Sequence, residues 1–241
     1  MIIAAAQTIP KQENIKDHCR WIELAAAHQV QLLIFPELSL TGYQREKAEE
    51  LSFVPDDPRL KPLQELAIKH EMIVIAGAPI QLPSGLHIGS FILFPDRSIL
   101  LYTKQFLHDG EELYFVPGNL HNPQLKLEGE SFSLAICADL ENPAHPENAS
   151  KTKSTAYLTS IFYTPNGIAG GLSKLQNYAA KYSFNVLMAN YGGDSYGMQS
   201  GGQSSFWTNA GEQKATLNFS GEGLIIAEKN NTEWTARIVT A

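Results

Sequence analysis

The sequence is poor in cysteine and has no long apolar run. Its 241 residues include two cysteines, Cys19 and Cys137, which are too few for a disulfide framework, and the seven histidines form no ligand-spaced group with them. We therefore expect no metal site and no cofactor. The first residues, MIIAAAQTIP, lack the positive charge and the length of a signal peptide, and no apolar stretch approaches the roughly 18–20 residues of a membrane helix. These absences predict a cytoplasmic protein whose cysteines are free to be reactive thiols.

Positive charge is also scarce. The chain has 18 Lys+Arg against 25 Asp+Glu, a formal charge of −7, and no basic cluster. This balance argues against nucleic acid or an anionic membrane as the partner and favours a small molecule. With 44% hydrophobic and 18% charged residues the chain is typical of globular proteins. Because no linker or change of composition interrupts it, we expect a single domain over residues 1–241.

Hydrophobic periodicity predicts alternating strands and helices in the first third of the chain. Short apolar runs at residues 1–7, 32–35 and 72–78 are typical of buried strands. Between them, Ile15, Cys19, Ile22 and Ala26 form a helical stripe that places Cys19 in the core, and a second helix is expected at 60–70. This order indicates an α/β layered fold.

The rest of the chain is expected to add further strands and one more helix. Proline at positions 143 and 146 predicts a turn there, and the tail after residue 203 predicts antiparallel hairpins. The expected elements are a hairpin at 90–94 and 99–104, strands at 131–137, 156–162 and 186–190, a helix at 172–184, and tail strands at 203–208, 215–219, 223–227 and 235–239. Together they indicate a mixed sheet that helices can cover.

Three chemically distinctive residues stand at the ends of predicted strands: Glu37, Lys104 and Cys137. Each alone has an ordinary structural explanation, as a helix cap or salt-bridge partner, an edge charge, or an inert core thiol. Strand ends in open α/β sheets are, however, where ligands and catalytic groups gather. A thiol with a pKa near about 8.5 also needs a base or a cation to become a nucleophile, which a carboxylate and an ammonium supply.

The sequence around each of these residues resembles the signature segments of one family. The segments are FPELSLTGY at 35–43, LYTKQFL at 101–107 with GEELYFVPG at 110–118, and LAICADL at 134–140. In this order they resemble the nitrilase superfamily, the carbon–nitrogen hydrolases, over at least residues 1–140. The resemblance implies a four-layer α-β-β-α sandwich of two mixed sheets with about six strands each, assembled into homodimers or larger homo-oligomers.

The resemblance also implies roles for individual residues. Cys137 would be the nucleophile, Glu37 the base, and Lys104 with the backbone N–H of Ala138 the stabilisers of the oxyanion. Glu111 corresponds to a second glutamate of the family that orients lysine and base, and Glu112 is an alternative beside it.

Further residues are candidates for contact with the substrate. Tyr43, Phe162 and Tyr163 are candidate pocket walls. His145 is either a substrate contact in the proline-rich turn or the partner of Cys137 in a rival Cys–His pair. His108 and His121 are expected in loops and have no assigned role.

The sequence departs from the family next to the nucleophile. Many amidase-like members carry an Arg-Phe-Pro-Glu run shortly after the cysteine, where this chain has ENPAHPE at 141–147, and Ala138 replaces a common aromatic residue. Asp139 favours the amidase-like branch over true nitrilases. We therefore expect hydrolysis of a non-peptide C–N bond in a small amide, with water as the second substrate. Acyl transfer and nitrile hydrolysis are alternatives, and a non-catalytic scaffold is the least favoured because Glu, Lys and Cys are all present.

Overall fold

The computed structural model describes residues 1–11, 14–119 and 122–240, so His121 lies outside the described residues. Strands run over Ile2–Gln7 (β1), Leu32–Ile34 (β2), Ile73–Leu82 (β3), Gly85–Leu93 (β4), Ile99–Thr103 (β5), Leu125–Leu127 (β6), Glu130–Ile136 (β7), Ala156–Ser160 (β8), Asn185–Ala189 (β9), Ser205–Trp207 (β10), Gln213–Thr216 (β11), Gly223–Asn230 (β12) and Glu233–Thr240 (β13). The α-helices are Asn14–Ala27 (α1), Ala48–Leu51 (α2), Lys61–Lys69 (α3), Ala144–Lys151 (α4) and Ile168–Tyr182 (α5), with short 3-10 helices at Arg45–Lys47 (η1), Pro58–Leu60 (η2), Glu111–Leu113 (η3) and Cys137–Glu141 (η4).

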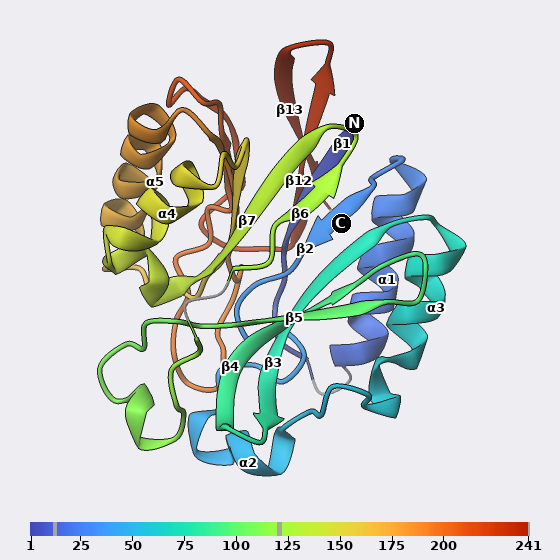
Figure 1. Ribbon diagram of the computed structural model, residues 1–241, viewed down its shortest axis with the longest axis vertical. Coiled ribbons are helices and arrows are strands. Elements are labelled where there is room, and N and C mark those ends of the chain that lie inside the picture. Colours follow the sequence, from blue (N-terminus) through green and yellow to red (C-terminus); the bar gives the residue numbers. More distant parts are fainter. Residues whose placement is uncertain (12–13, 120–121, 241) are drawn as a thin grey trace.

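The described strands form two mixed sheets, of seven and six strands. Their orders are β13-β12-β1-β2-β3-β4-β5 and β11-β10-β9-β8-β7-β6. Pairs β1/β2, β2/β3, β7/β8 and β8/β9 are parallel and the other pairs are antiparallel. In Figure 1, α1 and α3 cover the outer face of one sheet, and α4 and α5 cover the outer face of the other. The predicted four-layer α-β-β-α sandwich is confirmed, with one strand more in the larger sheet than the expected six.

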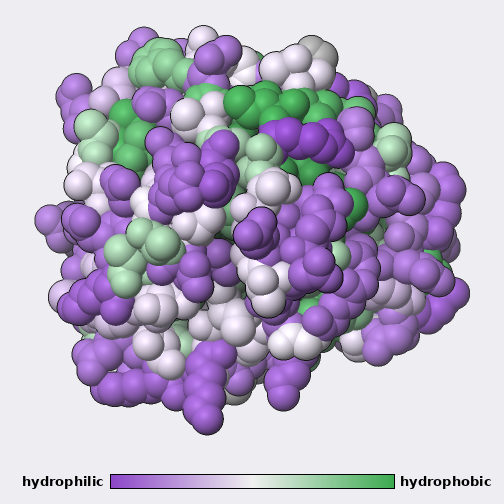
Figure 2. Space-filling view, turned by 90° about the horizontal axis from the view of Figure 1, so that it is seen from above, coloured by the Kyte–Doolittle hydropathy of each residue, from purple (hydrophilic) through white to green (hydrophobic). Residues whose placement is uncertain are grey.

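The strand sequences explain this layering because alternate residues of a strand face opposite sides. In β1, Ile3 and Ala5 belong to the core between the sheets, whereas Ala4 and Ala6 pack with Trp21 of α1. A third cluster joins the smaller sheet to α4 and α5. Both faces of the inner strands are therefore buried, which is why they read as continuous apolar runs. The face seen in Figure 2 is largely polar, and its apolar side chains gather in a few patches.

Three local predictions were wrong. The buried stripe of α1 is His18, Trp21, Ile22 and Ala25, so Cys19 lies beside it and is only partly buried. The proline-rich segment at 143–146 is the start of α4 rather than a turn. Proline is tolerated there because the N–H groups in the first turn of a helix have no acceptor within the helix, so the N–H that proline lacks costs no hydrogen bond. Strand β11 ends at Thr216, so the expected strand at 215–219 begins too late.

Two predicted elements were too short. Strand β4 begins at Gly85 rather than at residue 90 and pairs with β3 over nine residues, in a hairpin that the sequence pattern did not predict. Helix α5 begins at Ile168, four residues before the expected start. No helix among the described residues is both long and apolar enough to cross a bilayer.

The sheet topology brings the ends of β2 and β5 to one edge. Strand β2 is parallel to β3. Strand β4 is antiparallel to both β3 and β5, so β5 runs in the same direction as β3 and β2. The second sheet meets this edge where the Ser160 hydroxyl at the end of β8 donates to the Phe35 carbonyl oxygen at 2.8 Å. Because β7 is parallel to β8, the residue after β7 reaches the same edge.

One glycine is required for this edge to close. A Cβ built on Gly77 of β3 would lie 2.6 Å from the Leu38 nitrogen and 3.0 Å from the Pro36 carbonyl oxygen. Both are backbone atoms of the segment that carries Glu37. We expect Gly77→Ala to lower the free energy of unfolding by about 1–3 kcal/mol, the usual range for overpacking, in urea denaturation.

Gly170→Ala in α5 is the matched control for this prediction. A Cβ at Gly170 meets nothing within 4 Å, and alanine is the better helix former by up to about 1 kcal/mol. Equal unfolding free energies for the two variants would show that the approach of Gly77 to residues 36–38 is not a constraint.

Candidate active site

Glu37 lies just beyond β2, on a loop that is bonded to β3. The Leu40 N–H donates to the Gly77 carbonyl oxygen at 2.9 Å, and the Gly77 N–H donates to the Ser39 hydroxyl at 3.2 Å. The Tyr191 hydroxyl donates to the Glu37 carbonyl oxygen at 2.6 Å. The backbone of Glu37 is thus held from both sides while its side chain is fully buried.

A buried histidine of α1 supports the same loop. His18 Nδ1 lies 2.6 Å from the Asn14 carbonyl oxygen, so this nitrogen carries the proton, and Nε2 accepts from the Ser39 hydroxyl at 2.9 Å. Burial lowers the pKa of His18 to about 4. The neutral ring therefore keeps this arrangement over the whole physiological pH range.

Lys104 follows β5 and bridges two carboxylates. Its Nζ donates to Glu37 Oε1 at 2.7 Å and to Glu111 Oε1 at 2.8 Å, and all three side chains have no exposed surface. Burial alone lowers the pKa of Lys104, but the negative charges of Glu37, Cys137 and Glu111 outweigh it and raise the pKa above its ordinary value. Lys104 is therefore an ammonium at neutral pH.

Glu111 begins η3 and accepts hydrogen bonds at both of its oxygens. Oε2 accepts from the His108 N–H at 2.8 Å, and Oε1 accepts from the Tyr43 hydroxyl. Tyr43 in turn stacks on Phe162, with ring centroids 5.2 Å apart. Glu112, the neighbouring alternative, is exposed, so the structure places Glu111 and not Glu112 beside Lys104.

Cys137 follows β7 and opens η4 in a strained conformation. Its φ of 42° lies in the left-handed region, which L residues other than glycine rarely adopt. The side chain is partly buried, and the thiol donates weakly to the Phe162 carbonyl oxygen at 4.0 Å. Ala138 is the second residue of η4, and the first N–H groups of a helix have no acceptor within it.

Burial and neighbouring charge set the protonation of the base and the thiol. Burial raises the pKa of Glu37 to about 7, against the opposing attraction of Lys104. Burial, then the charge of Glu37, also raises the pKa of Cys137 above its ordinary value, and Lys104 reduces that rise. Oε2 of Glu37 is buried and has no hydrogen-bond partner among the described residues. A thiol at rest therefore sits near a carboxylate oxygen that is free to accept a proton.

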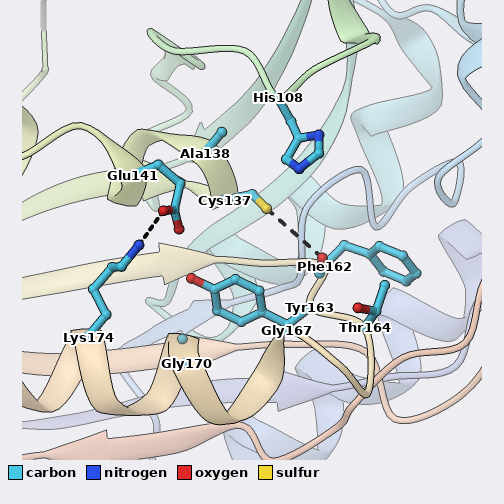
Figure 3. Close-up of a pocket in the computed structure, with 11 residues that line it drawn as sticks. His108, Cys137, Ala138, Glu141, Phe162, Tyr163, Thr164, Gly167, Gly170 and Lys174 are labelled. Atoms are coloured by element: carbon cyan, nitrogen blue, oxygen red, sulfur yellow. Dashed lines mark hydrogen bonds and ion pairs between the residues drawn. The ribbon is translucent and has the colours of Figure 1, made fainter.

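A cavity of about 450 Å³ opens onto Cys137. Its lining residues are His108, Cys137, Ala138, Glu141, Phe162, Tyr163, Thr164, Gly167, Gly170, Gly171 and Lys174. Figure 3 shows the Cys137 sulfur facing this space, with His108 on the loop above it and α5 below. The cavity is large enough for a small organic molecule.

His145 is not part of this cavity. It lies buried in α4, where Nε2 is 2.8 Å from the Tyr102 hydroxyl and Nδ1 is 2.6 Å from the Tyr157 hydroxyl. Burial lowers its pKa, although Asp139 opposes this. Both ring nitrogens are used, so the structure offers neither the Cys137–His145 pair nor a substrate contact at His145.

Asp139 was singled out only as a branch marker, but it connects the loops of the nucleophile and the lysine. Its Oδ1 accepts from the N–H groups of Gln105 and Phe106, each at 2.9 Å, and its Oδ2 accepts from the Ile136 N–H at 2.9 Å and the Tyr102 hydroxyl at 2.6 Å. The four hydrogen bonds that this one buried carboxylate accepts thus fix the spacing between residues 104 and 137.

Of the residues predicted for the site, the structure brings together Glu37, Lys104, Glu111 and Cys137, with Tyr43 and Phe162 stacked beside them. Ala138, Phe162 and Tyr163 line the cavity, whereas Tyr43 is bonded to Glu111. Sequence reasoning missed Lys174 and gave no role to His108, although both line the cavity. Among the described residues no group of three or more His, Cys, Asp or Glu side chains could hold a metal ion.

Comparison with known proteins identifies the family. A model of the family described as carbon–nitrogen hydrolase matches residues 2–237. The glutamine-dependent NAD(+) synthetase of Acinetobacter baylyi is 33% identical over an alignment of 151 positions, which covers 57% of this chain and 27% of that protein. The chain thus spans about a quarter of the length of this relative.

Solved amidase structures from Nesterenkonia sp. AN1 share the fold. The amidase NitN is 24% identical, with a TM-score of 0.85 over 96% of this chain and 93% of that chain. A variant with acrylamide added at its active-site cysteine gives a TM-score of 0.85 at 23% identity, over 96% of this chain and 94% of that chain. Because the family model covers nearly the whole chain, the protein belongs to the carbon–nitrogen hydrolase family.

Proposed function

We propose that the protein hydrolyses a non-peptide C–N bond of a small amide through an acyl thioester on Cys137. The observation that carries this proposal is the buried Glu37–Lys104–Glu111 cluster beside a thiol that opens into a cavity. Charged groups this deep cost free energy unless they are paired, and their position next to a strained cysteine favours a catalytic use.

In the first half-reaction Glu37 accepts the thiol proton at Oε2 as the Cys137 sulfur adds to the amide carbon. Negative charge then develops on the former carbonyl oxygen. Two of the three N–H bonds of the Lys104 ammonium are taken by Glu37 and Glu111, which leaves one for this oxyanion, together with the Ala138 N–H. Loss of one such donor typically lowers kcat by about 10²–10³-fold.

Glu37 then returns the proton to the nitrogen as the C–N bond breaks. Ammonia or an amine leaves, and the acyl group stays on sulfur as a thioester. In the second half-reaction Glu37 takes a proton from water, the hydroxide oxygen adds to the thioester carbon, and the C–S bond breaks. The acid is released, and the proton goes back to the Cys137 thiol.

The names of the relatives support an amide substrate. The Acinetobacter baylyi relative is glutamine-dependent, and one amidase structure from Nesterenkonia sp. AN1 holds butyramide. Another carries acrylamide on its active-site cysteine. These are properties of those proteins, and for this chain they favour an amide bond and a cysteine nucleophile.

Intact-protein mass spectrometry tests the nucleophile. We expect incubation with acrylamide or fluoroacetamide to give one adduct, located on Cys137 by peptide mapping and absent from Cys137→Ala. Cys19→Ser is the control and should keep the adduct, because Cys19 lies on α1 outside the cavity. Labelling that is confined to Cys19 would contradict the proposal.

Turnover of the Glu37→Gln variant tests the base. Glutamine cannot accept the thiol proton, so we expect ammonia release from short amides to fall by about 10²–10⁴-fold, while the far-ultraviolet circular dichroism stays that of the wild type. Activity near the wild-type level would mean that another group is the base.

A further inference from the structure

The wall of the cavity away from the nucleophile carries a pair of opposite charges. Glu141, the last residue of η4, forms an ion pair with Lys174 of α5, and their side chains are 56% and 29% exposed. Figure 3 shows the two side chains meeting across the same space that Cys137 faces. The proposed chemistry at Cys137 uses neither of them.

A third polar group of this wall has no partner. The Tyr163 hydroxyl is buried and lacks a hydrogen-bond partner among the described residues. Its ring is fixed against Gly171 of α5, where an added Cβ would lie 2.3 Å from the ring. In Figure 3 the hydroxyl points to the side of the cavity where Glu141 and Lys174 meet. The hydroxyl has almost no accessible surface, so a ligand atom reaches it only by displacing the groups that cover it, and a hydrogen bond there would satisfy a group that is destabilising while unpaired.

Glycine leaves room beside these groups. Gly170 of α5 lines the cavity and a Cβ there would meet nothing within 4 Å, whereas the space beside Gly171 is filled by the Tyr163 ring. Open space therefore extends from the thiol to the charged wall. Cys137, Glu141 and Lys174 line the same cavity, so an acyl chain that is bound to Cys137 lies in the space that the charged wall borders.

The combination of charges selects the kind of acyl group. A group with only a carboxylate would lie beside Glu141, and one with only an ammonium would lie beside Lys174, so each meets a like charge. A group with both can give its carboxylate to Lys174 and the Tyr163 hydroxyl and its ammonium to Glu141. Each protein charge then exchanges one partner for another and none is left unpaired.

We propose that Lys174, Glu141 and Tyr163 form a subsite for a zwitterionic acyl group. The substrates are then side-chain amides of amino acids, with the amide carbon at Cys137 and the amino-acid head at the charged wall. This proposal rests on the proposed function, because it needs the amide to react at Cys137. It adds residues that determine which amides react.

Four amides that differ only in the distal groups test the subsite. L-glutamine carries both groups, 5-amino-5-oxopentanoate only the carboxylate, 4-aminobutanamide only the ammonium, and butyramide neither. A second series, one methylene shorter, has asparagine in place of glutamine. We expect kcat/KM for glutamine, or for asparagine in its series, to exceed kcat/KM for the other three amides by about 10-fold or more. The reason is that each hydrogen bond to a charged group is worth roughly a 10- to 100-fold change in affinity.

Single variants then separate the two charges. Lys174→Met should lower kcat/KM for the zwitterionic amide by about 10- to 100-fold and leave butyramide within about twofold. Glu141→Gln should lower it for the zwitterion but raise it for the carboxylate-only amide, because a repulsive charge is removed. Lys151→Met, which breaks the exposed Lys151–Glu147 pair of α4, is the control and should change none of the four.

The outcomes distinguish this proposal from the proposed function. Alkylation of Cys137 by iodoacetamide, which has no distal group, reports the reactive thiol in every variant. Hydrolysis of amides with acylation of Cys137 supports the proposed function. If, in that case, neither glutamine nor asparagine has the highest kcat/KM of its series, or if Glu141→Gln does not change the ranking of the four amides by kcat/KM, the subsite proposal is overturned and the proposed function stands. If no amide in either series is hydrolysed and none acylates Cys137, both are overturned.

Discussion

The burial of one ammonium between two carboxylates is the constraint on which the rest of the site depends. Lys104, Glu37 and Glu111 have no exposed side-chain surface, and as two carboxylates and one ammonium they carry a formal excess of one negative charge. Glu111 is bonded by Lys104, the Tyr43 hydroxyl and the His108 N–H, whereas Glu37 receives a bond only at Oε1. Glu37, the less supported carboxylate, lies beside Cys137, and burial raises its pKa.

The surrounding structure holds this cluster at a fixed distance from the thiol. The His18–Ser39–Gly77 chain fixes the loop of Glu37, and the four hydrogen bonds of Asp139 join the loops of Lys104 and Cys137. These supports come from both sheets and from α1. The geometry of the reacting groups thus belongs to the core of the sandwich, whereas the recognition groups that we infer lie on η4 and α5 at its margin.

The alternation of strands and helices could be predicted from local patterns, whereas the four-layer fold and the roles of the central site residues were expected only because the segments around them resemble the carbon–nitrogen hydrolases. Buried strands read as apolar runs, and Glu37, Lys104 and Cys137 each interrupt such a run at its end. What the sequence does not contain is the long-range pairing of polar groups. Asp139 bonds to Tyr102, which is 37 residues away, and Glu141 pairs with Lys174, which is 33 residues away. His145 was assigned to a turn because proline suggests one, but its neighbours form the first turn of a helix. The homo-oligomeric assembly stays a prediction.

The protonation of Glu37 is the property that tests this account most directly. In a protein labelled with ¹³C at the glutamate side-chain carboxyl carbons, NMR titration should show one carboxyl group with a pKa near 7, raised by burial, and this signal should be absent from Glu37→Gln. Because the base must be deprotonated to act, kcat/KM should rise with pH through the same value. If every glutamate instead titrates at about 4–5, the ordinary range, Glu37 is not the poised base that this structure describes.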